Sequence, residues 1–509
     1  MTESFRLLDV PPEVLVHILG FLPLQALHAC QQSSRFLHGF VTASIELQYL
    51  IARSVAQVTD NPSSTLPISD RLRMLRSRET AFTTANPSWV TSIPVPFQMS
   101  GVYDLSAGFL FFGEDRRNAL RYIQLPSERP PEGAPPVEWG RIPVSSPQSM
   151  IIDFGLAIGE HDLVVIATFT PTGPTTAVGV LQGLINLELL TMSTHRPHPE
   201  SRGPIEVGTS SWGLPSSMME VVGDYLVFGE SYGGMMGGLL KPDDHVYIYE
   251  WRTGKLKMKI DAPNRSYFAA VFLSPEVLLL PNTTAATLEL WTIPSEQTTP
   301  TPTLTLHLPR LASEQGINVI TARGEPNPSV YPLRKPSRLP FYSSVDDSII
   351  LFHIHFPVQK FLLFIHRRTL LALLDKHTVG DTCVYADWGP GICRWLLAAG
   401  INVDWITTTS GQRSVLTPMR TTTPLFFFDF NRYMAQSHPH ACLPPTDDPF
   451  SNFGIWAEPV GSRLECHASR STETFSVYDG VSMDDERVVA FWVGRSLLSL
   501  LIAMVLISF

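Results

Sequence analysis

Residues 5–40 of this 509-residue chain read FRLLDVPPEVLVHILGFLPLQALHACQQSSRFLHGF, and the stretch has the spacing of three short amphipathic helices. Pro11 and Pro12 suit the start of the first helix, and Pro23 ends it. The apolar residues of this helix recur at a spacing that places them on one stripe: Val14, Leu15, Ile18, Leu19 and Leu22. A segment this short cannot bury a core alone, so it needs a second surface to pack against.

The second and third helices have their own apolar positions, which are Leu24, Leu27, Cys30, Phe36, Leu37 and Phe40. The whole stretch resembles an F-box, which opens on Leu-Pro-x-Glu and continues with a Leu/Ile-rich helix, a spaced leucine pair and a Cys-Arg-x-Trp-like close. The matching segments here are Val10-Pro11-Pro12-Glu13-Val14, Ile18–Pro23, Leu24 with Leu27 and Cys30, and Ser34-Arg35-Phe36. Val14 stands where the family more often has Leu, and it keeps that position apolar.

The resemblance implies a partner and a set of contact residues. An F-box binds a Skp-type adaptor and, through it, a cullin. The residues that the resemblance assigns to adaptor binding are Leu8, Pro11, Pro12, Leu15, Ile18, Leu19, Leu22, Leu27, Cys30 and Phe36.

The rest of the chain changes texture at about residue 89. Residues 51–88 continue with helical spacing, whereas from Trp89 onward short β-type runs are separated by Gly, Pro, Asn and Asp. Glu250-Trp251 and Leu290-Trp291 lie about one blade length apart on the ~40–45 residue scale of propeller repeats. We therefore expect an α+β multidomain chain: an F-box at residues 1–50, a helical linker at 51–88 and a degenerate seven-bladed β-propeller at 89–493. An array of two-sheet β-sandwiches would satisfy the same short strands.

The C-terminal residues 494–509 are strongly apolar and, after Arg495, uncharged. They are fewer than the ~20 residues that a helix needs to span a bilayer, which favours a hydrophobic C-terminal tail that forms a terminal strand, a packed helix or no defined structure. Extending the segment back to Val488 gives enough length, but it places Arg495 inside the membrane. A membrane contact through residues 488–509 is therefore the less favoured alternative.

Four further segments resemble a run found in the large F-box protein families of mushroom-forming fungi, which have a β-propeller-like C-terminal region. They are Val384–Pro390 with its Trp-Gly-Pro, Cys393-Arg394-Trp395, Gly411-Gln412-Arg413 and Asp429-Phe430-Asn431-Arg432-Tyr433. Ser69–Phe82 and the turn Tyr249–Gly254 fit the same pattern. The resemblance indicates kinship over most of the chain, but only its F-box implies a function.

Composition excludes several classes of function. A net charge of −10 argues against nucleic acid as a partner, because no basic face is offered to phosphates. The dense arginines of residues 71–78 are expected on the solvated face of a helix. Five scattered cysteines without a CxxC pair indicate neither a zinc site nor a disulfide framework. With no signal peptide apparent, we expect a cytoplasmic or nuclear protein.

Three local patterns could suggest chemistry, and each has a simpler structural interpretation. Gly233–Gly238 lacks the spacing of a phosphate-binding loop. His353 and His355 would share one face of a strand without an identifiable third metal ligand. The paired carboxylates at 346–347, 447–448 and 484–485 have the sequence of turns. We expect no catalytic residue, no cofactor and no metal.

The sequence therefore predicts a substrate-receptor subunit of an SCF-type ubiquitin ligase, as the F-box resemblance implies. The β domain would hold a protein target that the sequence does not identify. A non-ligase β-propeller scaffold is the alternative. An enzyme with its site in a propeller channel is a third possibility, for which no residue stands out.

Overall fold

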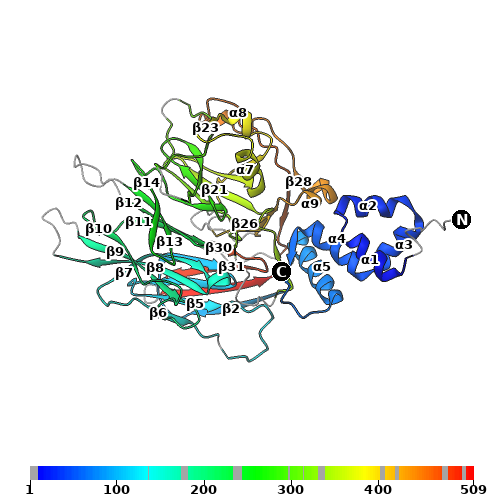
Figure 1. Ribbon diagram of the computed structural model, residues 1–509, viewed down its shortest axis with the longest axis horizontal. Coiled ribbons are helices and arrows are strands. Elements are labelled where there is room, and N and C mark those ends of the chain that lie inside the picture. The colour runs from blue at the N-terminus through cyan, green and yellow to red at the C-terminus, as the bar shows by residue number, and fades with distance from the viewer. Residues whose placement is uncertain are drawn as a thin grey trace.

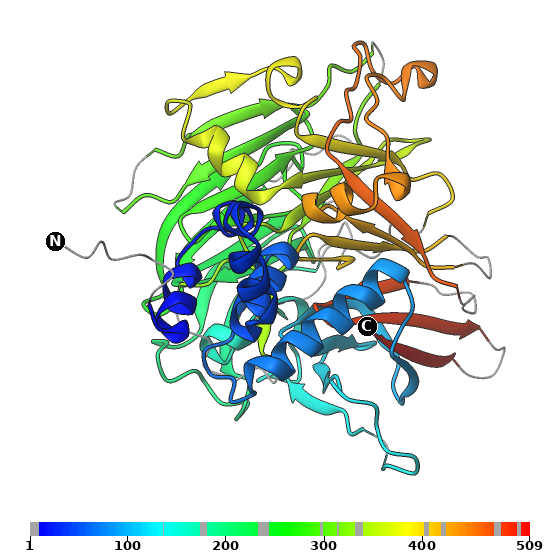
Figure 2. The same cartoon turned by 90° about the vertical axis from the view of Figure 1, so that its right-hand side faces the viewer.

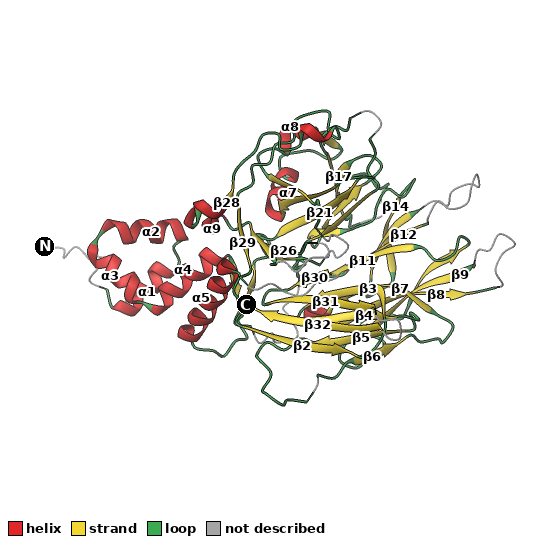
Figure 3. Ribbon diagram, turned by 180° about the vertical axis from the view of Figure 1, so that it is seen from behind, coloured by secondary structure: helices red, strands yellow, loops and turns green. Residues whose placement is uncertain are grey.

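A computed structural model gives the fold of the chain. It describes residues 10–135, 137–173, 181–232, 244–295, 299–312, 315–330, 339–401, 407–418, 424–472, 480–495 and 500–509. The N-terminal helices gather at one end of the molecule, and strands with a few short helices among them make up the rest (Figure 3). The N-terminal helices project from a ring of β-sheets, with the N-terminus at the far end (Figure 1).

The helical unit, residues 12–84, contains the helices α1 (Pro12–Gly20), α2 (Leu24–Ser33), α3 (Arg35–Ala43), α4 (Ile45–Ala56) and α5 (Ile68–Thr84). Ser34 and Ser44 cap α3 and α4, because their side chains accept hydrogen bonds from the amides of Leu37 and Leu47. The predicted division at residue 50 falls inside α4, which contacts α1 and α3 as well as α5. The first three helices and the linker therefore form one packed unit.

Among the described residues, the strands beyond the helical unit form seven sheets of four or five strands each. The first four sheets in ring order are called blades 1 to 4. Blade 1 contains β30 (Gly480–Met483), β31 (Arg487–Arg495), β32 (Leu500–Ser508) and β2 (Trp89–Val95), and blade 2 contains β3 (Met99–Ser106), β4 (Phe109–Glu114), β5 (Ala119–Gln124) and β6 (Gly140–Pro143). Blade 3 contains β7 (Met150–Ala157), β8 (Leu163–Pro171), β9 (Gly183–Thr191) and β10 (Ile205–Ser210), and blade 4 contains β11 (Ser216–Val222), β12 (Tyr225–Ser231), β13 (His245–Glu250) and β14 (Lys255–Asp261).

Blades 5 to 7 complete the ring. Blade 5 contains β15 (Val271–Ser274), β16 (Val277–Asn282), β17 (Thr287–Thr292), β18 (Leu304–His307) and β23 (Asp381–Cys383). Blade 6 contains β19 (Val319–Arg323), β21 (Ile349–His355), β22 (Lys360–His366) and β24 (Cys393–Leu397). Blade 7 contains β25 (Thr409–Ser410), β26 (Arg413–Leu416), β27 (Phe426–Asp429), β29 (Cys466–Arg470) and β28 (Cys442–Leu443). Short helices lie in the connections: α6 (Ile158–His161), α7 (Arg367–Leu374), α8 (Tyr385–Trp388) and α9 (Arg432–Ser437). The predicted seven-bladed β-propeller is confirmed, and the sandwich alternative is excluded.

The two ends of the propeller sequence meet in blade 1. Strand β2 pairs antiparallel with β32 from Trp89 opposite Ser508 to Val95 opposite Ile502, and β32 also pairs with β31. The apolar C-terminal segment is thus a strand between two others, as the favoured interpretation had it, and the propeller extends to Ser508 rather than ending at residue 493. No helix among the described residues has the length and hydrophobicity needed to cross a bilayer.

The helical unit lies over one face of the ring (Figure 2). The short strand β1 (Val58–Asp60), which follows α4, pairs with β20 (Phe341–Ser343). Because β20 lies between the first and second strands of blade 6, the helical unit occupies the face that carries the turns between these strands. We call it the helix-side face. First strands of neighbouring blades contact one another, so they surround the propeller axis.

Candidate protein-interaction surface on the helical unit

The apolar stripe of α1 is divided into two rows in the folded chain. Leu15 and Leu19 are buried, with 1% and 2% of their surface exposed. Val14, Ile18 and Phe21 face outward, with 45%, 38% and 77% exposed. Each row follows helical spacing, and the two rows are offset by one residue. The stripe therefore supplies both an internal core and an apolar surface.

The inward row belongs to a core that unites the first four helices. Its buried members are Leu15, Leu19, Leu27, Val41 and Leu47, and Leu22 and Cys30 pack against them while half-buried. Since Leu47 comes from α4, the short N-terminal stretch does obtain its second packing surface from the helix that follows it.

The predicted adaptor-binding residues are therefore of two kinds. Pro11, Pro12, Ile18 and Phe36 are exposed and available for direct contact. The buried residues Leu15, Leu19 and Leu27 cannot contact a partner without unfolding, so their part is to hold the exposed helices in place; Leu8 lies outside the described residues. Sequence reasoning missed Phe21, although it continues the Val14–Ile18 spacing by one further turn.

This end of the molecule is unusually poor in charge. Between residues 10 and 44, only Glu13 and Arg35 carry a formal charge with His neutral. Of the fourteen exposed large hydrophobic side chains among the described residues, four lie in this region, Val14, Ile18, Phe21 and Phe36, and a fifth, Ile45, directly follows it. Phe36 stacks on Phe40 with ring centroids 6.1 Å apart, which presents aromatic surface on α3. Apolar surface of this kind marks protein-interaction sites.

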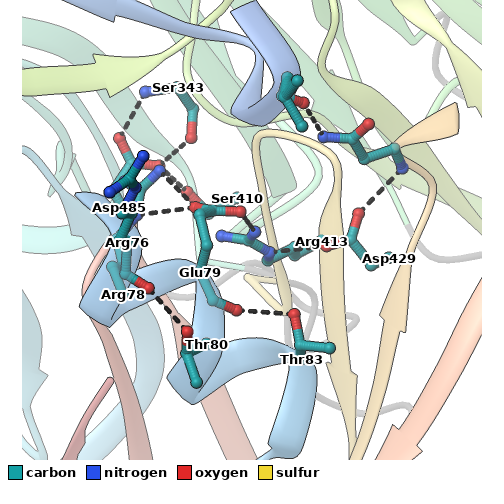
Figure 4. Close-up of polar contacts among 12 residues, drawn as sticks. Arg76, Arg78, Glu79, Thr80, Thr83, Ser343, Ser410, Arg413, Asp429 and Asp485 are labelled. Carbon is teal, nitrogen blue, oxygen red and sulfur yellow. Dashed lines mark hydrogen bonds and ion pairs between the residues drawn. The ribbon is translucent and has the colours of Figure 1, made fainter. Parts of the chain in front are cut away.

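A buried ion-pair cluster attaches the helical unit to the propeller (Figure 4). The Arg413 guanidinium on β26 pairs with Glu79 of α5 and, at 2.9 Å, with Asp429 of β27. It also lies 4.4 Å from the centre of the Phe82 ring. Burial alone would raise the pKa of Glu79, but Arg413 and Arg78 outweigh it and hold that pKa below its ordinary value. The carboxylate is therefore ionised and paired at neutral pH.

A second set of contacts lies beside this cluster. Asp485 of blade 1 accepts hydrogen bonds from the Ser343 hydroxyl and the Ser410 hydroxyl, both at 2.6 Å. The Asn431 amide donates to the carbonyl of Val55 at the end of α4. The Arg78 guanidinium lies 4.7 Å from the centre of the Phe341 ring. Blades 6, 7 and 1 thus hold α4, α5 and β1 together.

The arginines of α5 were expected on a solvated helix face, and that expectation is wrong for two of them. Arg71 pairs with Asp60 at 3.0 Å and donates to two carbonyls, those of Leu66 and Ser64. Arg78 is buried against blade 6. Only Arg73 and Arg76 remain exposed. Sequence periodicity did not reveal that α5 is covered by the propeller.

The downstream motifs have structural tasks. Gly411-Gln412-Arg413 and Asp429-Phe430-Asn431 lie at the junction just described. In blade 6, the Trp395 indole donates to the Tyr385 hydroxyl, which donates to the carbonyl of Gly461. Arg394 donates to three backbone carbonyls of the segment that leads to β29, those of Leu443, Pro444 and Leu464. These motifs therefore build the fold and its attachment to the helical unit.

The other candidate patterns do not assemble a chemical site among the described residues. No group of metal ligands occurs there, and His353 is buried within blade 6. The paired carboxylates make structural contacts: Asp347 accepts from Gln57 at the end of α4, Asp447 pairs with Arg463, and Asp484 pairs with Arg487. Gly233–Gly238 lies outside the described residues.

Comparison with known proteins gives fold neighbours without a family. No protein-family model and no curated protein matches the sequence. Among solved structures, the chain is similar to the C-terminal WD40 domain of Sif2, with TM-score 0.34 and 10% identity, covering 82% of this chain and 97% of that one. It is also similar to BamB from Moraxella catarrhalis, with TM-score 0.36 and 11% identity, covering 83% and 100%. The assignment of the fold rests on the strand order above.

Proposed function

We propose that this protein is the substrate receptor of an SCF-type ubiquitin ligase of the F-box class. The observation that carries the proposal is the outward row Val14, Ile18 and Phe21 on α1, in a region with almost no charge. Such a row, with anchors one helical turn apart, fits an apolar groove of a partner. The order of prolines, leucines and Phe36 along α1–α3 supports a Skp-type adaptor as that partner.

The mechanism of such a receptor is positional. The adaptor and a cullin bring a ubiquitin-charged enzyme to one end of the complex, while the propeller holds a protein target at the other. The buried junction around Arg413 supports this role, because it fixes the orientation of α1–α3 relative to the blades. The proposal assigns no catalytic step to this chain, and the ligase setting places it in the cytoplasm or the nucleus.

The test is co-purification of the full chain with a Skp-type adaptor and a cullin, using Ile18→Asp as the perturbed variant. Ile18 is an exposed residue, so the substitution leaves the core of the helical unit intact. The added carboxylate would be buried unpaired at the interface, which costs about 3 kcal/mol or more, or at least about 100-fold in affinity. Ile68→Asp is the matched control, because both isoleucines are 38% exposed on helices and Ile68 lies outside α1–α3.

Loss of adaptor binding in Ile18→Asp with retention in Ile68→Asp is the expected result. Adaptor binding that survives both Ile18→Asp and Phe21→Asp would contradict the proposal. If the wild-type chain captures proteins through the propeller but never an adaptor or a cullin, the non-ligase scaffold is the correct function.

A further inference from the structure

A short segment that follows β19 crosses the propeller axis on the helix-side face. We call this segment, Gly324–Val330, the axial strap. It leaves blade 6, where Arg367 donates to the carbonyl of Gly324 at 2.9 Å and the Gly411 amide of blade 7 donates to the carbonyl of Glu325 at 2.8 Å. Its far end reaches blade 3, because the amide of Val330 donates to Glu160 of α6 at 2.7 Å. Blades 3 and 6 lie on opposite sides of the ring, so the strap spans the axis.

Carboxylates of three blades hold the strap from across the axis. Asn327 donates to Glu220 of β11 in blade 4 at 2.9 Å. Glu160, which accepts from Val330, also accepts from the amide of Gly223 in the first turn of blade 4 at 3.1 Å. Arg323, the last residue before the strap, contacts Asp104 of blade 2 at 2.7 Å and Glu220 at 2.5 Å.

Charge within this cluster is unbalanced. The Arg323 guanidinium also contacts Glu325 of the strap itself, at 2.8 Å, so one cation faces three carboxylates. Asp153 of β7 is a fourth acidic group in this cluster, because it interacts electrostatically with Asp104 and Glu220. Arg367 is the second cation near Glu325, and it is fully buried. With every group ionised, the cluster has four negative and two positive charges.

Two of these carboxylates titrate in the neutral range. Burial raises the pKa of Glu325 to about 7, and Glu220 and Asp104 raise it too, while Arg323 and Arg367 act in the opposite direction. Burial also raises the pKa of Asp153 to about 7, with Asp104 and Glu220 adding to it and the Phe154 amide opposing it. A rise in pH through neutrality therefore adds negative charge beside like charges at the place where the strap is held.

We propose that the axial strap is a pH-sensitive latch, which holds the helix-side end of the propeller axis closed most firmly in mildly acidic conditions and loosens as the pH rises to neutrality. Glu325 is the group that moves with the strap. When the strap is released, Glu325 regains water and loses its repulsion from Glu220 and Asp104. Higher pH therefore favours the released state. This device is independent of adaptor binding and adds a regulated opening to the propeller.

Hydrogen exchange of the full chain, followed by mass spectrometry of peptides, tests the latch. The reporter is the peptide that contains Val330, and labelling times at pH 6 and pH 8 are scaled to equal chemical exchange. One carboxylate with a folded pKa of about 7 changes the opening equilibrium by about tenfold between these values, so the reporter should lose about tenfold in protection. Glu325→Gln keeps a hydrogen-bonding side chain without the charge and should abolish this change.

Two comparisons complete the experiment. A peptide from β8 reports global opening, and the strap should exchange faster than β8 at both pH values, because the strap opens without unfolding of the propeller. Asp115→Asn, in the exposed turn after β4, is the control substitution and should behave like the wild type. Equal protection of the strap at both pH values, an unchanged response in Glu325→Gln, or a strap that exchanges no faster than β8 would each overturn the latch.

Discussion

Replacing Arg413 by Met tests whether the ion-pair cluster attaches the helical unit to the propeller. The side chain of Arg413 is 12% exposed and those of Glu79 and Asp429 are 19% and 11%, so solvent screens these pairs little. Met keeps much of the volume but leaves two carboxylates without their shared cation. Removing one partner of a buried pair costs about 3–5 kcal/mol in the free energy of unfolding.

Urea unfolding of the wild type, Arg413→Met, Glu79→Gln and the double variant measures this cost as a cycle. Because Glu79 and Arg413 contact each other, the double variant should lose less than the sum of the single losses, by about 1–3 kcal/mol. Arg73→Met is the control: its ion pair with Asp70 is exposed and should contribute under ~1 kcal/mol. Two results would show that this ion pair does not attach the helical unit to the propeller. One is additive losses of stability in the double variant, and the other is a loss from Arg413→Met as small as that from Arg73→Met.

The same junction has a pH dependence of known sign. The pKa of Glu79 is lower in the folded chain than its ordinary value, so its contribution is present above that ordinary value and is lost as the pH falls through the folded pKa. The wild type should therefore lose stability in acid more steeply than Glu79→Gln does. Urea midpoints collected across the acid range give the comparison directly.

Two further predictions concern the propeller itself. Asp153→Asn should stabilise the chain by about 1–4 kcal/mol at pH 8, because the folded pKa of Asp153, about 7, lies above its ordinary value. The cost of burying the charged carboxylate grows as the pH rises from the ordinary pKa to the folded one. Urea unfolding should therefore show a smaller stabilisation by Asp153→Asn at pH 5 than at pH 8. A chain that ends at Arg495 lacks β32, which leaves β2 without its partner and exposes apolar strand edges. Size-exclusion chromatography should show aggregates for the truncated chain, and a stable monomer would contradict this ring closure.

The sequence predicted the kinds of element well and their partners poorly. Short β-type runs with turn residues between them were sufficient for a propeller, since local alternation and turn chemistry are encoded in neighbouring residues. The place of the last strand was less clear, because residues 494–509 are apolar on both faces and so resemble a tail or an anchor. Their partner β2 begins at Trp89, at the opposite end of the propeller sequence, and no local pattern connects the two.

The interaction surface was predicted in part for a similar reason. Helical spacing placed Leu15 and Ile18 on one apolar stripe, and no rule of periodicity distinguishes its inner edge from its outer edge. The packing of α2, α3 and α4 against α1 makes that division, by burying Leu15 and leaving Ile18 exposed. The arginines of α5 follow the same logic, because Arg78 is buried by a β20 that lies far along the chain.

Closure of the ring and attachment of the helical unit depend on the same side chains. Phe509, the last residue, stacks on Phe82 of α5 with ring centroids 4.7 Å apart, and both rings contact Phe427 of blade 7. The carbonyl of Ser508 accepts from Ser88, in the short connection between α5 and β2. A chain whose last strand is unpaired therefore lacks part of the surface on which α5 packs. Closure of the ring therefore completes the surface on which α5 packs, and it adds to the contacts by which blades 6 and 7 fix the orientation of the helical unit.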